Sequence, residues 1–129
     1  MADKQLWEPK YRTGDFPTVV DRGLAAKLGT NDGEFALATD INGLFGIVQL
    51  AALRDGGRGT LYEEGGDAHV QAGGAFDRGD NLTVNSSGKF VKIGTTAGTY
   101  HCAGIARDDA SADGDIVRMK YSKFSVTIS

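Results

Sequence analysis

Two histidines and one cysteine are the residues of this sequence best suited to nucleophilic or acid-base chemistry. His101 and Cys102 are neighbours in a segment that is expected to be a strand. Neighbouring side chains of a strand point to opposite faces, so these two cannot act together as a base and a nucleophile, or bind one metal ion. His69 lies in another strand-like segment, and no motif places a serine or cysteine beside it. The sequence therefore predicts no catalytic residues.

The stretch Ser87-Gly88-Lys89-Phe90 is superficially similar to a phosphate-binding loop. That loop requires Gly-x4-Gly-Lys followed by a hydroxyl residue. Here Thr83 stands at the position of the first glycine, and Phe90 stands where the hydroxyl residue should be. We therefore interpret the stretch as a turn between two strands.

An acidic cluster around Gly114 is the other candidate site, formed by Asp109, Asp113 and Asp115. It lacks the one-three-five carboxylate spacing and the final glutamate of a calcium-binding loop. One cysteine and two histidines also cannot supply a zinc site from soft ligands alone. We expect solvated turn carboxylates, with no metal and no cofactor. Because carboxylate pairs can meet in space without a local motif, a small β enzyme stays open as an alternative.

The bulk composition excludes several classes of protein. The 129 residues include 17 acidic and 14 basic residues, and the formal charge of −3 has the wrong sign for binding phosphate backbones. No apolar run is long enough to span a membrane, and the first residues lack the pattern of a signal peptide. We expect a protein that is made in a cytoplasm and binds neither nucleic acid nor a membrane.

Glycine is the most unusual feature of the composition, with 19 glycines against only two prolines. The glycines are spread singly and in pairs between short apolar runs, which is typical of many tight turns. Short strands at about 8 to 12 residue spacing indicate an all-β fold, a small Gly-rich barrel or sandwich. The expected strands cover residues 18–20, 25–28, 34–38, 44–50, 60–63, 68–72, 81–84, 89–93, 100–106, 115–121 and 124–128.

Three echoes in the sequence indicate two pseudo-repeats. The pairs are Asp21-Arg22-Gly23 with Asp77-Arg78-Gly79, Gly33-Glu34-Phe35 with Gly88-Lys89-Phe90, and Gly46-Ile47-Val48 with Gly104-Ile105-Ala106, at offsets of 56, 55 and 58 residues. Two copies favour a closed pseudo-symmetric domain, since a solenoid needs about three or more. We predict a single β domain over 18–129, with pseudo-repeats at approximately 18–66 and 67–121 and a last strand over 124–128.

Residues 1–17 are expected to form an extended N-terminal arm, because they show no strand or helix periodicity and have a proline near each end. The arm contains Trp7, Tyr11 and Phe16. Apolar surface left in water costs about 25 cal/mol per Å², so large aromatic side chains need a cover. Either the domain itself or a neighbouring molecule is expected to provide it.

Several segments together resemble one known family. They are 7–11, 45–47, 70–80, 86–89, 103–106 and 112–117, which read Trp-Glu-Pro-Lys-Tyr, Phe-Gly-Ile, Val-Gln-Ala-Gly-Gly-Ala-Phe-Asp-Arg-Gly-Asp, Ser-Ser-Gly-Lys, Ala-Gly-Ile-Ala and Ala-Asp-Gly-Asp-Ile-Val. In their order and spacing these segments resemble the capsid cement, or decoration, proteins of tailed bacteriophages, a family formerly known as a domain of unknown function. The resemblance is strongest from Val70 to Val117.

The resemblance implies a structural protein of the virion that sits on the outer surface of the capsid. It implies a homotrimer that clamps neighbouring subunits of the major capsid protein and stabilises the head without catalysis. On this reading Trp7, Tyr11 and Phe16 are candidates for contact with the capsid or with a neighbouring subunit. The alternatives are a host-binding fibre or adhesin-type β module and, third, the small β enzyme.

Overall fold

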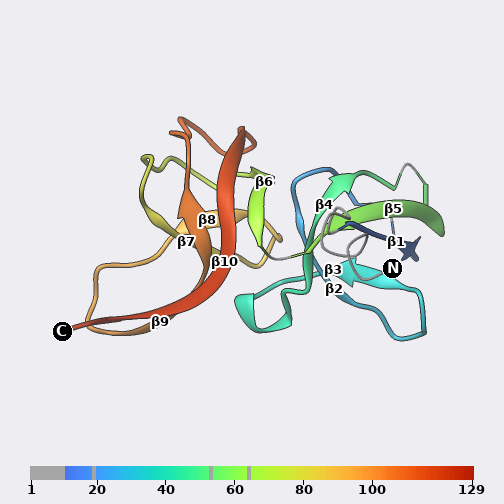
Figure 1. Cartoon of the computed structure of the whole chain (residues 1–129), viewed down its shortest axis with the longest axis horizontal. Coiled ribbons are helices and arrows are strands. Elements are labelled where there is room, and N and C mark those ends of the chain that lie inside the picture. Colours follow the sequence, from blue (N-terminus) through green and yellow to red (C-terminus); the bar gives the residue numbers. More distant parts are fainter. Residues whose placement is uncertain (1–10, 19, 53, 64) are drawn as a thin grey trace, which may run out of the picture.

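The computed structural model describes residues 11–18, 20–52, 54–63 and 65–129. In these ranges ten strands form two antiparallel five-stranded sheets, which lie side by side (Figure 1). The one helical element described is the 3-10 turn η1, Ile41–Gly43, and no described helix is long and apolar enough to cross a membrane. The predicted all-β class is therefore confirmed.

The first sheet has the strand order β1-β5-β4-β2-β3. Its strands are β1 (Tyr11–Phe16), β2 (Ala25–Leu28), β3 (Phe35–Leu37), β4 (Gly46–Leu50) and β5 (Gly57–Tyr62). The second sheet has the order β6-β10-β9-β7-β8. Its strands are β6 (Gly66–Gln71), β7 (Asn81–Val84), β8 (Phe90–Lys92), β9 (Gly98–Ala106) and β10 (Ile116–Ile128).

Two expected strands differ in the structure. Val20, from the expected strand over 18–20, makes only an isolated bridge to Ala52. The expected strands 115–121 and 124–128 are one long strand, β10, because an irregularity between Tyr121 and Phe124 shifts its register against β9 without ending the pairing. A bulge of this kind bends a strand and lets it continue in a new direction.

Residues 11–16 of the expected arm instead form strand β1, which pairs with β5. Its inward positions are Gly14 and Phe16, both buried. A Cβ atom at Gly14 would come within 2.3 Å of the Phe35 ring, so this position requires glycine. Since glycine carries no hydrophobic signal, the period-two pattern of this strand is invisible in the sequence.

The two sheets have the same strand order when the strand numbers of the first are shifted by five. Their registers correspond as well: Ala26 pairs with Gly46 in the first sheet, and Leu82 pairs with Gly104 in the second. These partners are separated by the offsets of 56 and 58 residues that the sequence echoes have. The duplication itself stays a prediction, which the matching registers support.

Two buried clusters form the core. The larger one combines first-sheet residues such as Ala25 and Ile47 with second-sheet residues such as Val70 and Met119, so the two sheets share apolar packing. The smaller cluster belongs to the first sheet and its flanking loops and consists of Phe16, Val20, Ala26, Phe35, Val48, Ala52 and Leu61. The shared cluster supports the prediction of a single domain and gives the second sheet a fixed support from behind.

Candidate functional site

The structure places His101 and Cys102 on opposite faces of β9, as the sequence predicts. Cys102 is buried, and burial raises the pKa of its thiol, which disfavours the reactive thiolate. His101 is exposed, and its Nδ1 lies 2.9 Å from Oγ of Ser125 on β10. His69 lies on β6, where its backbone N–H donates to the side chain of Gln49. The three residues therefore serve separate local contacts.

The stretch similar to a phosphate loop is a turn that its own side chains hold closed. Oδ1 of Asn85 accepts from the N–H groups of Ser87 and Lys89 at 2.9 and 3.0 Å, and Gly88 has φ +76°. The ammonium of Lys89 donates to Asp113 at 2.8 Å. This contact ties the turn to the acidic cluster, and the prediction of a turn is confirmed.

The carboxylates of the acidic cluster point to different partners. Asp109 accepts from the backbone N–H of Arg78 at 2.7 Å, and Asp115 accepts from N–H and Oγ of Ser111. The hydrogen bonds from Ser111 lower the pKa of Asp115. Among the described residues, no group of three or more acidic, histidine or cysteine side chains could hold a metal ion. These carboxylates order turns.

The three contact candidates of the expected arm have different places. Trp7 lies outside the described residues. Tyr11 is 54% exposed, and its ring lies 5.3 Å from that of Tyr62. Phe16 is 0% exposed and belongs to the smaller core cluster, so its assignment as a contact residue is corrected to core packing. The own-domain cover that the sequence left open is therefore realised for Phe16.

A polar surface on the second sheet is the largest candidate site. Along β10, Val117, Met119 and Tyr121 point into the core, and the residues between them point outward. Pairing with β6 and β9 brings further exposed residues beside them. We call this surface the outer face of the second sheet and define it by Asp67, His69, Ile105, Arg107, Ile116, Arg118 and Lys120.

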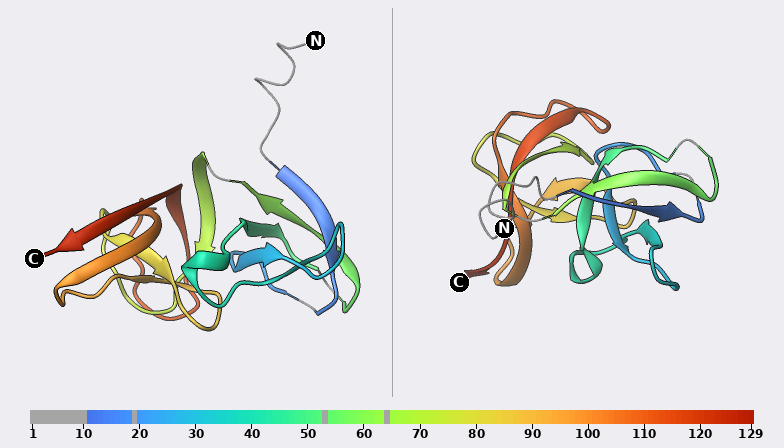
Figure 2. Two further views of the ribbon diagram at one scale, coloured as in Figure 1. Left: turned by 90° about the horizontal axis from the view of Figure 1, so that it is seen from below. Right: turned by 45° about the vertical axis from the view of Figure 1, so that its right-hand side comes forward.

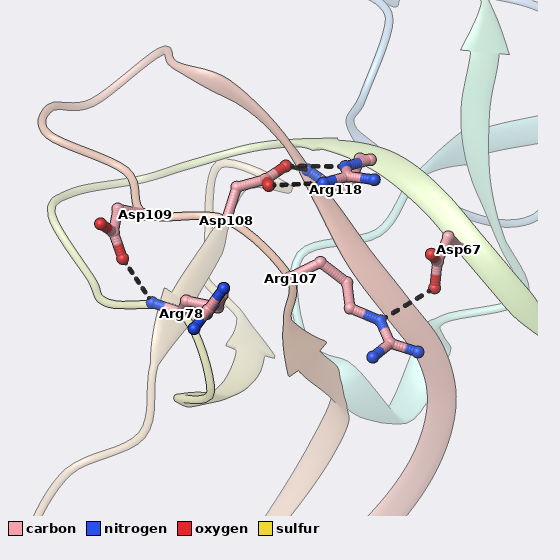
Figure 3. A network of polar contacts seen from close by, with 6 residues as sticks. All are labelled: Asp67, Arg78, Arg107, Asp108, Asp109 and Arg118. Atoms are coloured by element: carbon pink, nitrogen blue, oxygen red, sulfur yellow. Dashed lines mark hydrogen bonds and ion pairs between the residues drawn. The ribbon is translucent and has the colours of Figure 1, made fainter.

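The outer face holds its arginines in fixed positions (Figure 3). The backbone N–H of Arg107 donates to the carbonyl of Arg118, so these like charges are cross-strand neighbours. Like charges in this arrangement repel, and carboxylates compensate here. Asp108 accepts two bonds from the Arg118 guanidinium, at 2.8 and 3.0 Å, and Asp67 accepts from Nε of Arg107 at 3.1 Å. The two guanidinium groups are thus oriented before any partner arrives.

These contacts give Asp108 an unusual acidity. Hydrogen bonds from the Arg118 side chain, and then from its backbone N–H, lower the pKa of Asp108 from 3.8 to about 2. Carbon-detected NMR is expected to show the Asp108 carboxyl titrating near pH 2, with a rise toward 3.8 in Arg118→Gln. The stabilisation is present above the ordinary pKa and is lost as the pH falls through about 2. A midpoint near 3.8 in the unmodified protein contradicts this arrangement.

Exposed apolar side chains accompany these charges. Ile105 is 36% exposed and Ile116 is 43% exposed. Ile105 lines a hollow of about 480 Å³ together with Arg78, Arg107 and Arg118. Exposed aliphatic groups beside arginine are typical of protein–protein contact surfaces, in which Arg is enriched. Sequence reasoning missed this face, although the alternation of basic and apolar residues over 116–121 was a signal for it.

The comparisons with known proteins agree on a phage structural protein. A family model described as phage cement protein matches residues 17–121. No curated protein matches the chain. Among solved structures, the N base of the head fiber gp8.5 in bacteriophage phi29 is similar, with a TM-score of 0.66 and 20% identity over 87% of this chain and 92% of that one, a likeness in fold. Since the family model covers most of the sequence, this chain belongs to the phage cement protein family.

Proposed function

We propose that this protein binds the outer surface of a phage head as a homotrimer and clamps neighbouring subunits of the major capsid protein. Membership of the cement family gives the coarser role, a structural protein on the phage capsid. The proposal adds the side of the shell, the partner and the number of copies. Three sites on one particle bind with avidity, so modest contacts per subunit are sufficient for lasting attachment.

The observation that carries the proposal is the outer face of the second sheet. Its arginines are oriented by Asp67 and Asp108, and exposed Ile105 and Ile116 lie among them. A surface whose side chains are already ordered loses less conformational entropy on binding. The sheet behind it is supported by the shared core cluster, so the face keeps its shape under load. Such a surface provides binding and no chemistry, which is what a cement requires.

The N-terminal segment is proposed as a second contact. Tyr11 begins β1 and is half exposed, and Trp7 precedes it by four residues. Since β1 belongs to the first sheet and the outer face belongs to the second, contacts at both extend the footprint of one subunit. A longer footprint favours contact with two capsid subunits at a time.

The test measures binding of the purified protein to heads that lack it, by co-sedimentation. Ile105→Asp is expected to weaken binding about tenfold or more, because it places a charge in the apolar part of the contact. Deleting residues 2–10, which leaves β1 intact, is expected to weaken it as well. Leu28→Asp is the matched control: Leu28 is 61% exposed on the first sheet, and its replacement is expected to leave binding unchanged.

An unmodified protein that ignores such heads but binds host cells would overturn the proposal in favour of a fibre or adhesin module. Equal binding by Ile105→Asp and by the unmodified protein would remove the outer face from the contact. Equal binding by the 2–10 deletion would remove the N-terminal segment.

A further inference from the structure

The C-terminal half of β10 leaves its sheet. Residues 116–121 of β10 pair with β6 on one side, whereas 124–128 pair only with residues 98–102 of β9. Figure 2 shows this part of β10 running away from both sheets to the C-terminus. We call residues 98–102 and 124–128 the β9–β10 ribbon. Neither of its outer edges is paired with another strand in the part of the chain that the structure describes.

The ribbon has one apolar and one polar face, because paired residues of antiparallel strands share a face. The apolar face consists of Tyr100, Cys102, Phe124, Val126 and Ile128. On the polar face Thr99 contacts Thr127 at 3.2 Å and His101 contacts Ser125 at 2.9 Å. These cross-strand contacts hold the two strands in one register.

The apolar face of the ribbon lacks a cover of its own. Phe124, Val126 and Ile128 are only partly buried, and neither core cluster includes them. An isolated two-stranded ribbon is marginally stable in water, because such a pair needs further strands or packing on its apolar face. Lys123 anchors the base of the ribbon by donating to the carbonyl of Leu44, but the tip extends beyond this contact. The tip therefore needs a partner.

The edges of this ribbon differ from the other sheet edges. Natural edge strands avoid pairing with strangers by being short or by carrying charges. Edge strands β3 and β8 have three residues each, β1 carries Arg12 and Asp15, and β6 carries Asp67. Residues 124–128, which read Phe-Ser-Val-Thr-Ile, have no charge, no proline and no glycine. This edge is suited to receive a strand.

We infer that three copies of this chain join their ribbons around the three-fold axis, the β10 edge of one against the β9 edge of the next. Each copy offers two different free edges, so it binds two neighbours, and such head-to-tail contacts close into a ring. Because β9 and β10 are antiparallel, every new pair in the ring is antiparallel as well. The apolar faces then point inward and the polar faces point to solvent.

Charge favours a second copy as the occupant. The whole chain has a net charge of −3, so contact between copies through charged surfaces is repulsive. The ribbon has no acidic or basic residue other than His101, which lies on the polar face. Identical ribbons can therefore approach without repulsion. The inference rests on the proposed homotrimer and is independent of where that trimer binds.

The first test compares Val126→Lys with Thr127→Lys by analytical ultracentrifugation. These variants add the same charge to neighbouring positions of one strand, on the apolar and the polar face. Val126→Lys is expected to move self-association to about 100-fold higher concentration, because a charge inside the ring lacks a partner. Thr127→Lys is expected to remain a trimer. A trimeric Val126→Lys, or loss of the trimer in both variants, overturns the arrangement.

The second test needs no substitution, so it stays decisive if Val126→Lys does not fold. In an isolated ribbon the amides of 124–128 that point outward exchange with solvent freely, and in the ring all of them are hydrogen-bonded. Hydrogen exchange of the free protein is expected to show protection throughout 124–128. Alternating protection, or protection that appears only on heads, overturns the inference. A stable trimer that does not bind heads leaves it standing and instead contradicts the proposed function.

Discussion

Replacing Phe16 by alanine is expected to lower the free energy of unfolding by about 3–5 kcal/mol. The ring is wholly buried in the smaller core cluster, 5.8 Å from the ring of Phe35. It also lies over Gly59, where a Cβ atom would come within 2.7 Å of it. A cavity in this position removes the contact between β1 and the rest of the first sheet. Urea denaturation followed by circular dichroism measures the change.

Tyr11→Ala is the control for Phe16→Ala, because it removes another aromatic ring from the same strand. Tyr11 is 54% exposed, and its contact with Tyr62 is worth about 0.5–1.5 kcal/mol for an aromatic pair. A similar loss in both variants would mean that β1 is not docked through Phe16. This outcome would restore residues 11–16 to the free arm that the sequence suggests.

Gly104→Ala is expected to destabilise the protein by about 3 kcal/mol or more, at the upper end of the usual cost of overpacking. Gly104 lies in β9 between β7 and β10, opposite Leu82 and Tyr121. A Cβ atom there would come within 1.9 Å of the backbone carbonyl oxygen of Lys120. A side chain can rotate away from such a clash, but a carbonyl in a paired strand cannot. The second sheet must therefore separate or bend.

Gly74→Ala is the matched control for this substitution. A Cβ atom at Gly74 would meet nothing within 4 Å, and its φ is not in the left-handed region. Its effect is expected to stay within about 0.5 kcal/mol. Thermal unfolding of the two variants beside the unmodified protein measures the difference. If Gly104→Ala is as stable as Gly74→Ala, β9 and β10 do not approach each other as closely as described.

Much of the strand pattern could be predicted because turns declare themselves in sequence. Gly33, Gly88 and Gly114 have φ values between +76° and +96°, which glycine adopts without strain, and each follows residues that favour turns. Between such turns, short apolar runs have little alternative to a strand. The strand over 81–84 was predicted with its observed bounds for this reason.

The candidate site was less accessible to sequence reasoning, because its parts are distant in the chain. Asp67 contacts Arg107 across 40 residues, and the Arg107–Arg118 neighbours meet only through the pairing of β9 and β10. No local motif encodes such a contact. The arm residues illustrate the converse, since Phe16 was assigned to a surface when its strand partner, β5, lies more than 40 residues away.

The sequence by itself determined the all-β class, the places of most turns and the separate roles of His101 and Cys102, because φ preferences and the period of a strand are local properties. It also carried the family resemblance. Only the tertiary structure decided that residues 11–16 join a sheet, that charged side chains from β6, β9 and β10 form one face, and that the end of β10 leaves its sheet. These features depend on which strands become neighbours, and strand pairing is set by the packing of the whole chain.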